Sequence, residues 1–360
     1  MKIFFASSNS SKGFHNDFSI CLGKACGVER LYIIKGGPGT GKSYFLHTVA
    51  KYAVSQGYDA TYYACSSDPS SLDGIRLEKK GKPCVALMDG TAPHVCEPTL
   101  PGIQEDLVNL GAFWDTQKLR ASAQEVKNAS RLKSAAYAEA YQYLSAAGKT
   151  QEVADDLILP CVQHEKLCAL ASRIVKHQPT GKVFCATPAH LRAVSMSGKA
   201  YLDTFEQMAK ASGGDMVVIQ DYYGTAWCLT QEILRMAEHK KCKVLVSRDP
   251  VHLSHVDGIF FEDTGLCVLV SKRTEDASCA SPHAHTVSLR RYVDAKKIKE
   301  IRTRLRQTKH LTDALTDAAL ESLHRAGKYH FELEAIYASA MDFSQKEAYT
   351  QDFCQRIFQK

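Results

Sequence analysis

The residues best suited to chemistry lie together in one stretch, which reads Gly36-Gly37-Pro38-Gly39-Thr40-Gly41-Lys42-Ser43. Glycines at this spacing let the backbone turn so that several N–H groups point at one anion. A lysine adds a point charge for phosphate oxygens, and a serine hydroxyl can hold a divalent cation. The pattern Gly-x-x-x-x-Gly-Lys-Ser therefore predicts a phosphate-binding loop, or P-loop, with Lys42 on the β- and γ-phosphates and Ser43 on Mg²⁺.

The segments on both sides of this loop fit the same prediction. An apolar run of β-forming residues, 31–34, precedes the loop, and a helical pattern follows it. This order places the loop at the positive end of a helix, which adds to its attraction for an anion. An ordinary strand-to-helix turn would share the glycines but not a lysine and a serine in register. The expected helix has one apolar face, formed by Phe45, Leu46, Val49, Ala50 and Ala53.

A second apolar run, 85–88, ends in a candidate partner for the loop, Asp89. There the carboxylate would bind Mg²⁺ directly or through water, as a Walker B aspartate does. A solvated turn aspartate is the alternative, because a glycine follows it. Since that glycine replaces the glutamate with which many ATPases activate water, another base is needed, and His94 and Glu97 are candidates that also suit ordinary loop positions. The predicted catalytic residues are Lys42, Asp89 and His94.

The chain repeats itself once. Residues 2–6 resemble residues 182–186, which lie 180 positions later, and residues 113–149 align without a gap to a segment 179 positions later. Chance explains any one match but not a series in the same order. The sequence therefore predicts a tandem duplication, with halves at 1–180 and 181–360. Further matches are Gly39-Thr40 with Gly224-Thr225, Asp73-Gly74 with Asp257-Gly258, and Gly148-Lys149 with Gly327-Lys328.

The predicted fold class is α/β, with a P-loop-type, doubly wound parallel sheet in each half. Apolar runs at 31–34, 60–64 and 85–88 are rich in β-formers and are expected to be strands. Apolar strands separated by helices are typical of a parallel sheet that is covered on both faces. Residues 115–177 then take a helical period, which predicts a helical hairpin beside the sheet, repeated at 294–358.

Two further aspartates lie between these predicted strands. Asp68 follows the second strand and would face the ligand-binding edge of the sheet, although an N-cap or Asx-turn role before Pro69 is the preferred interpretation. Asp73 precedes Gly74, and this pair is interpreted as a turn.

The second half keeps the scaffold and loses the chemistry. Alignment on its Gly-Thr pair leaves no lysine, no serine and fewer glycines in the corresponding loop. An aspartate at the start of that loop would also repel phosphate. We therefore expect a degenerate, non-binding copy and one nucleotide per chain. The replacements are Asp221 for Gly36, Ala226 for Gly41, Trp227 for Lys42, Cys228 for Ser43 and Lys272 for Asp89.

Composition limits the compartments and the classes of partner that are expected for the protein. The chain has 360 residues, of which 45% are hydrophobic and 23% charged, with a mild net charge of +6. No apolar run is long enough for a signal peptide or a membrane span, and the 13 cysteines form no Cys-x-x-Cys pair, so we expect a reduced, cytoplasmic protein without a membrane partner. The basic run at 290–309 alternates with apolar residues at helical spacing. It is expected to be the solvated face of an amphipathic helix, so a nucleic-acid partner is not expected.

Three stretches, 34–43, 65–74 and 89–95, together resemble a family of duplicated P-loop proteins from Gram-positive, mostly anaerobic or spore-forming bacteria. Members are usually described as ATPases or nucleotide kinases. The resemblance covers most of both halves and implies ATP binding, but no particular substrate. The family tends to carry a usable loop in its second half, and this chain departs from it there, so a mechanism with two nucleotide sites is not expected. The stretches read IKGGPGTGKS, CSSDPSSLDG and DGTAPHV.

The sequence thus predicts an ATP-binding protein, a Mg²⁺-dependent ATPase with one working site in the first half. Phosphoryl transfer needs mainly positioning and charge neutralisation, which the predicted residues can supply. One alternative is a nucleotide or small-molecule kinase, with the hairpin at 115–177 as a lid over the acceptor. Another is a nucleotide-gated interaction module with negligible turnover, whose partner the sequence leaves unidentified.

Overall fold

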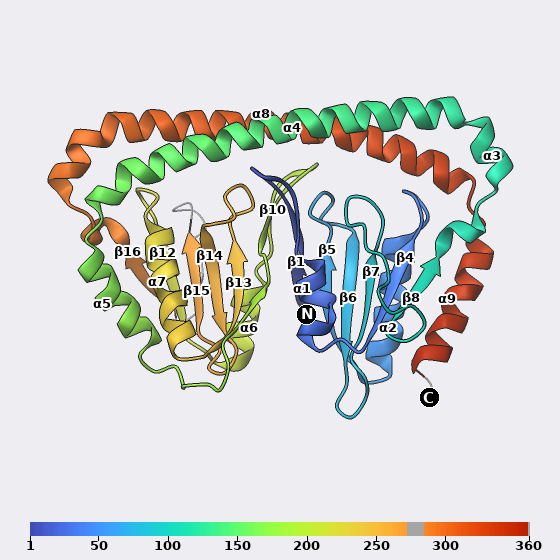
Figure 1. Ribbon diagram of the computed structural model, residues 1–360, viewed down its shortest axis with the longest axis horizontal. Helices are drawn as coiled ribbons and strands as arrows, with labels where there is room; N and C mark the ends of the chain where they lie inside the picture. Colours follow the sequence, from blue (N-terminus) through green and yellow to red (C-terminus); the bar gives the residue numbers. More distant parts are fainter. Residues whose placement is uncertain (272–283, 359–360) are drawn as a thin grey trace.

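The computed structural model describes residues 1–271 and 284–358, and Figure 1 shows two sheets side by side beneath a pair of long helices. The first sheet has six strands, five of which run in one direction while β6 runs against them. Its strands, in spatial order, are β1 (Lys2–Phe5), β5 (Asp59–Ala64), β6 (Leu72–Glu78), β7 (Val85–Asp89), β4 (Arg30–Lys35) and β8 (Glu105–Asn109).

The second sheet repeats this order strand for strand, again with one antiparallel member, β14. The predicted duplication is therefore confirmed as two similar α/β halves, and each sheet is mostly rather than wholly parallel. Its strands, in the matching order, are β9 (Cys185–Pro188), β13 (Lys243–Arg248), β14 (Val256–Phe261), β15 (Cys267–Ser271), β12 (Met216–Gln220) and β16 (Ala284–Ser288).

The strands and the helix predicted around the glycine-rich stretch are present. The apolar run at 31–34 lies within β4, and the run at 85–88 forms β7, which ends at Asp89. Helix α2 (Lys42–Ser55) buries the five apolar residues expected on its inner face. Both strands are buried over most of their length, as expected for strands inside a covered sheet.

The prediction of a turn at Asp73-Gly74 is wrong, because both residues lie in the buried strand β6. An Asp-Gly pair usually marks a turn, but here the glycine serves close packing. A Cβ atom on Gly74 would lie 2.9 Å from Leu22 and 3.1 Å from Phe18, both in the short helix α1 (Phe18–Leu22). Gly258 has the same role in β14, where a Cβ would lie 3.3 Å from Phe205.

The predicted helical hairpins are also wrong. Helices α3 (Thr116–Ala121) and α4 (Ala123–Ile158) leave the first sheet, and α4 crosses above both sheets, as Figure 1 shows. At 1.5 Å per residue its 36 residues extend about 54 Å, which is long enough to reach the other half. Helix α8 (Ala295–Ser339) runs back in the opposite direction along α4.

Each long helix is followed by a shorter helix that packs on the sheet of the other half. Helix α5 (His164–Val175), from the first half, joins the core of the second sheet and packs against α7 (Ala226–His239). Helix α9 (Phe343–Phe358), from the second half, joins the core of the first sheet and packs against α2. The two halves of the sequence therefore exchange their last helices.

The inner faces of the two sheets share one further core. Helices α1 and α6 (Thr204–Ser212) lie between the sheets, and buried residues of both halves belong to the same cluster. The remaining short elements of the described residues are two hairpins and four single turns of 3₁₀ helix. They are β2 (Ser7–Ser10) with β3 (Gly13–Asn16), β10 (Arg192–Ser195) with β11 (Gly198–Tyr201), and turns at Lys24–Cys26, Leu110–Phe113, Leu159–Cys161 and Leu289–Tyr292.

The exchange follows the repeat closely. A backbone bridge joins Trp114 to Met341, and its counterpart joins Val293 to Val162, so each bridge is the other one moved by the predicted offset of 179 residues. The side chain of Asp115 caps α3, and Asp294 caps α8 in the same way.

The amphipathic interpretation of the basic run also holds, because Ile298 and Ile301 of α8 are buried while the charged residues between them are exposed. No helix within the described part of the chain combines the length and the apolar composition needed to cross a bilayer.

Substitution of Phe353 by Ala should lower the free energy of unfolding by about 3–5 kcal/mol, because it removes a buried ring from an exchanged helix. Phe353 is 1% exposed, and its ring lies 5.0 Å from Tyr32 and 5.2 Å from Phe45 of the other half. Phe331→Ala, at a position that is 53% exposed, is the matched control and should cost under about 1 kcal/mol. Urea unfolding measures both, and equal losses would contradict the exchange.

Candidate functional site

A glycine-rich loop, residues 36–41, joins the end of β4 to the start of α2. Gly39 and Gly41 have positive φ angles of 69° and 74°, a conformation that favours glycine. Gly41 is the N-cap residue of α2, and no side chain caps the helix. The first N–H groups of α2 therefore lack a side-chain acceptor, which suits them to bind an anion.

Lys42 lies folded back over this loop. Its ammonium group donates to the carbonyl oxygens of Gly36 and Gly37 at 3.1 and 2.9 Å, and lies 3.5 Å from the carboxylate of Asp89. The other carboxylate oxygen of Asp89 accepts the backbone N–H and the hydroxyl of Thr91. Asp89 is 7% exposed, so it is a buried acid that faces the loop and not a solvated turn residue.

Two more buried side chains, Asp73 and His94, join Asp89. One potential ligand atom from each of the three residues lies within 4.8 Å of the others. His94 lies between the ring edges of Phe14 and Phe18, with its Nε2 atom 3.2 Å from the carboxylate of Asp73. Burial raises the pKa of Asp73, His94 lowers it in part, and the neighbouring charge of Asp89 raises it further.

This cluster is incompletely paired, because one oxygen of Asp73 and both ring nitrogens of His94 are buried without a hydrogen-bond partner. The contact between the two side chains has the distance of an ion pair but lacks hydrogen-bond geometry. Buried polar atoms normally have partners, so such orphaned atoms indicate a missing group. Carboxylate oxygens and an imidazole nitrogen are ligands for a divalent cation.

Ser43 connects the loop to this cluster. Its hydroxyl oxygen accepts the backbone N–H of Leu72 at 2.9 Å, directly before Asp73 in β6. A hydroxyl oxygen has two lone pairs, so one remains for a metal ion. The predicted residues Lys42, Ser43, Asp89 and His94 therefore all lie at one edge of the first sheet.

Sequence reasoning missed Asp73 as a site residue, although the repeat contained a signal. Its counterpart Asp257 is also buried in a strand, but there Arg192 lies 3.1 Å away and the hydroxyl of Ser247 donates at 2.6 Å. The second half thus pairs this acid with its own arginine, whereas in the first half Asp73 has no arginine partner, and its ion-pair contact is to a histidine.

Other predicted contributors lie elsewhere. Asp68 accepts from the Ser70 N–H and hydroxyl and from the Ser71 hydroxyl, which supports the Asx-turn interpretation. Arg248, which a sequence-based guess would let the second half lend to the first site, instead donates to the carbonyl of Leu253 in its own half. The prediction that Lys272 replaces Asp89 falls on a residue outside the described part of the chain.

The second half closes its own loop with Asp221. Oxygens of this carboxylate accept the backbone N–H groups of Tyr223, Gly224, Thr225 and Ala226, at 2.9–3.3 Å. The carboxylate thus holds the donors that a phosphate would need. Trp227, at the position of Lys42, stacks on His255 with a ring separation of 5.4 Å, and His255 in turn lies 2.8 Å from Asp155 of α4. These contacts argue against a second anion site.

The second half also covers the first loop. A Cβ atom on Gly37 would lie 3.2 Å from the ring of Tyr337, and one on Gly39 would lie 2.3 Å from the carbonyl oxygen of Glu334. Both partners belong to α8, so these glycines let α8 touch the loop. The site is therefore built from both halves of the chain.

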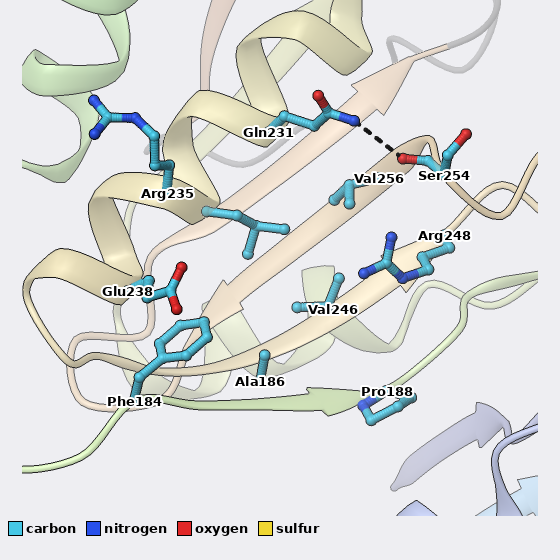
Figure 2. A pocket seen from close by; sticks show the side chains of 11 residues that line it. Phe184, Ala186, Pro188, Gln231, Arg235, Glu238, Val246, Arg248, Ser254 and Val256 are labelled. Atoms are coloured by element: carbon cyan, nitrogen blue, oxygen red, sulfur yellow. Dashed lines mark hydrogen bonds between the residues drawn. The ribbon is translucent and has the colours of Figure 1, made fainter.

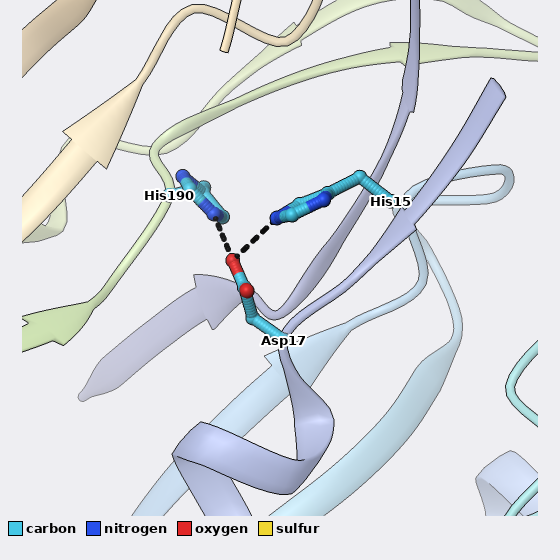
Figure 3. A group of neighbouring side chains, drawn as sticks. All are labelled: His15, Asp17 and His190. Atoms are coloured by element: carbon cyan, nitrogen blue, oxygen red, sulfur yellow. Dashed lines mark hydrogen bonds and ion pairs between the residues drawn. The ribbon is translucent and has the colours of Figure 1, made fainter. Parts of the chain in front are cut away.

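A second polar cluster joins the two halves, and Figure 3 shows Asp17 between His15 and His190. Burial alone would raise the pKa of Asp17, but the two histidines hold it well below its usual range. The backbone N–H of Arg248 donates to Nδ1 of His190, so Nε2 carries the proton that Asp17 accepts at 2.8 Å. That nitrogen is thus unavailable to a metal ion, and the cluster serves as a satisfied contact between the halves.

A cavity of about 390 Å³ lies in the second half, between α7 and strands β9, β13 and β14, as Figure 2 shows. Apolar residues such as Phe184 and Val246 line it, together with Arg235, Glu238 and Arg248. None of its lining residues belongs to the glycine-rich loop or to the Asp73–Asp89–His94 cluster, so it is separate from the candidate site.

Substitution of Asp221 by Ala should lower the free energy of unfolding by about 1.5–3 kcal/mol, because loop N–H groups lose a charged acceptor. Asp215→Ala, at an exposed position just before β12, is the control and should have little effect. Urea denaturation measures both variants. A loss no larger for Asp221→Ala than for the control would show that the carboxylate does not hold the second loop.

Comparisons with protein-family models, with curated proteins and with solved structures gave no match. The function is therefore inferred from the chemistry of the site alone.

Proposed function

We propose that the first half binds ATP with Mg²⁺ and hydrolyses its terminal phosphoanhydride bond. One observation carries this proposal: a half-buried lysine and a buried, incompletely paired acidic cluster meet at an uncapped helix N-terminus that begins in left-handed glycines. Helix N-termini and glycine-rich turns bind phosphate, and a lysine beside them fits a polyphosphate chain. These features support the proposal that the loop is the P-loop that the sequence predicts.

Each loop residue has a role in this proposal. The amides of residues 36–41 and of the first turn of α2 bind phosphate oxygens. Lys42 exchanges its two carbonyl contacts for the β- and γ-phosphates, because a charge-assisted bond to phosphate is stronger than a bond to a neutral carbonyl. Gly41 keeps side-chain atoms away from the ligand at the helix start.

The acidic cluster fits Mg²⁺ because the unpaired oxygen of Asp73 is the ligand type that this cation prefers. Ser43 and Asp89 would hold Mg²⁺, with Asp73 close by. The bound cation would neutralise charge on the phosphates. His94 lies too deep among aromatic rings to meet bulk water, so it serves to position Asp73 and Asp89.

A second candidate function, a nucleotide-gated interaction module, is favoured by the contact between α8 and the loop. Because Glu334 and Tyr337 lie against the glycines, a ligand in the loop acts directly on the helix that spans both halves. The kinase alternative relied on a helical hairpin as a lid, and no such hairpin exists among the described helices. Turnover measured on the purified protein separates hydrolysis from gating.

Lys42→Ala should weaken ATP binding by about 10- to 100-fold, because it removes a charge-assisted contact to phosphate. Calorimetric titration with a non-hydrolysable ATP analogue measures this effect. Wild type and Lys51→Ala, a control at an exposed position of α2, should bind one nucleotide per chain. A stoichiometry near two, with one site surviving in Lys42→Ala, would contradict both the site and the closed second loop.

Asp89→Asn should reduce Mg²⁺-dependent binding and turnover by about tenfold or more, while leaving Mg²⁺-free nucleotide binding within a few-fold of wild type. The change removes a charge that attracts metal and almost no volume. Asp59→Asn, at an exposed position in β5, is the control. Parallel titrations with and without Mg²⁺ give the comparison, and an equal loss in both would mean that Asp89 only holds Lys42 and Thr91 in place.

A further inference from the structure

One buried charge beside the glycine-rich loop is offset only in part by a neighbouring carboxylate, that of Glu347. Lys346 of α9 is 3% exposed, and within the described residues its ammonium group makes no hydrogen bond or ion pair. It lies against ring faces instead, 4.5 Å from the centre of Tyr44 and 5.4 Å from that of Phe343. Burial lowers the pKa of Lys346, because it disfavours the charged form.

The position of this ammonium group is informative. A Cβ atom built on Gly41 would lie 2.9 Å from the Lys346 nitrogen, and Gly41 is the residue that begins α2. Tyr44, its other neighbour, lies in the first turn of the same helix. The charge is therefore held beside the uncapped N–H groups of α2, by a helix that comes from the other half of the chain.

A second lysine adds to the positive charge around the loop. Lys133 of α4 has a lowered pKa, first because it is partly buried and then because the charge of Lys42 lies near it. The charge of Glu334 offsets this effect on Lys133 only in part. Buried ammonium groups with such weak compensation are costly, unless an anion binds among them. Cation–π contacts with Tyr44 and Phe343 offset only part of that cost.

We propose that Lys346 is a phosphate-binding residue that the second half supplies to the site of the first. Its ammonium group binds an oxygen of the polyphosphate chain beside the first turn of α2, away from the oxygens that Lys42 contacts. The inference rests on the proposed nucleotide site and adds a residue and a consequence to it. A bound polyphosphate then bridges α2 and α9, so it tightens the contact between the two halves.

The competing explanation is that Lys346 only packs its stem against aromatic rings. The two explanations predict different anion affinities for Lys346→Met, which keeps the length of the side chain and removes the charge. If the charge serves an anion, the variant is at least as stable as wild type without ligand and binds polyphosphate more weakly. If the side chain serves packing alone, anion affinity does not change.

The experiment titrates Mg²⁺-ATP and, separately, inorganic tripolyphosphate into wild type, Lys346→Met and Lys328→Met. Lys328, an exposed lysine of α8, is the charge-matched control. We expect Lys346→Met to bind both probes about tenfold or more weakly, with a weaker dependence on salt, and the control to match wild type. Lys346→Arg, which keeps the charge, should recover part of the affinity and provides the test if the methionine variant does not fold.

The outcomes separate this inference from the proposed function. Wild-type affinity for both probes in Lys346→Met would overturn the inference and leave the nucleotide site intact. Tripolyphosphate binding that depends on Lys346, without ATP binding, would overturn the proposed function and support the inference. Binding of neither probe by wild type would overturn both.

Discussion

Each sheet of this protein depends on a helix that the other half of the chain supplies. Helix α9 adds Phe353, Cys354 and Phe358 to the core of the first sheet, and α5 adds its own apolar face to the second. Neither face could stay exposed to water, since burial of apolar surface is the main force that holds a domain together. The long helices α4 and α8 follow from this exchange, because only helices of their length carry the short ones across. The two halves are therefore a single folding unit, although the sequence repeats as two.

The shared scaffold carries two loops with opposite chemistry. In the second half, Asp221 accepts the loop N–H groups and Arg192 neutralises Asp257, so charges and donors are satisfied within the protein. In the first half the corresponding donors lack a carboxylate, and Asp73 and His94 keep orphaned atoms. A buried donor or acceptor without a partner is costly, and such a cost is common where a ligand completes the structure. The second loop thus shows how the same scaffold pairs these groups without a ligand, and the glycine-rich loop lacks that pairing.

Local patterns in the sequence predicted β4, β7, α2 and the repeat, because periodicity and turn residues act over a few positions. These patterns failed where a contact with a residue distant in sequence determines the local structure. Gly74 reads as part of a turn, yet it lies in a strand because Leu22 and Phe18 approach it closely. The helical period of residues 115–177 is the same for a hairpin and for a helix that crosses to another sheet. The two structures differ in which apolar surface α5 covers, and that surface belongs to the second half. The sequence around Lys346 does not distinguish it from a surface lysine of an amphipathic helix. Its burial results from the packing of α9 on the other half and not from its neighbours in sequence.

The exchange also gives the second half a structural role that does not depend on its own loop. The first sheet needs α9 to cover its face, and the glycine-rich loop lies against Glu334 and Tyr337 of α8. Any ligand that draws the loop, α2 and α9 together must also favour one arrangement of the long helices, and coupling between two sites is reciprocal. A ligand in the loop and a partner bound to α8 would therefore change each other's affinity by the same factor. The second half thus acts on the first site through packing, while the carboxylate of Asp221 keeps its own loop folded without a ligand.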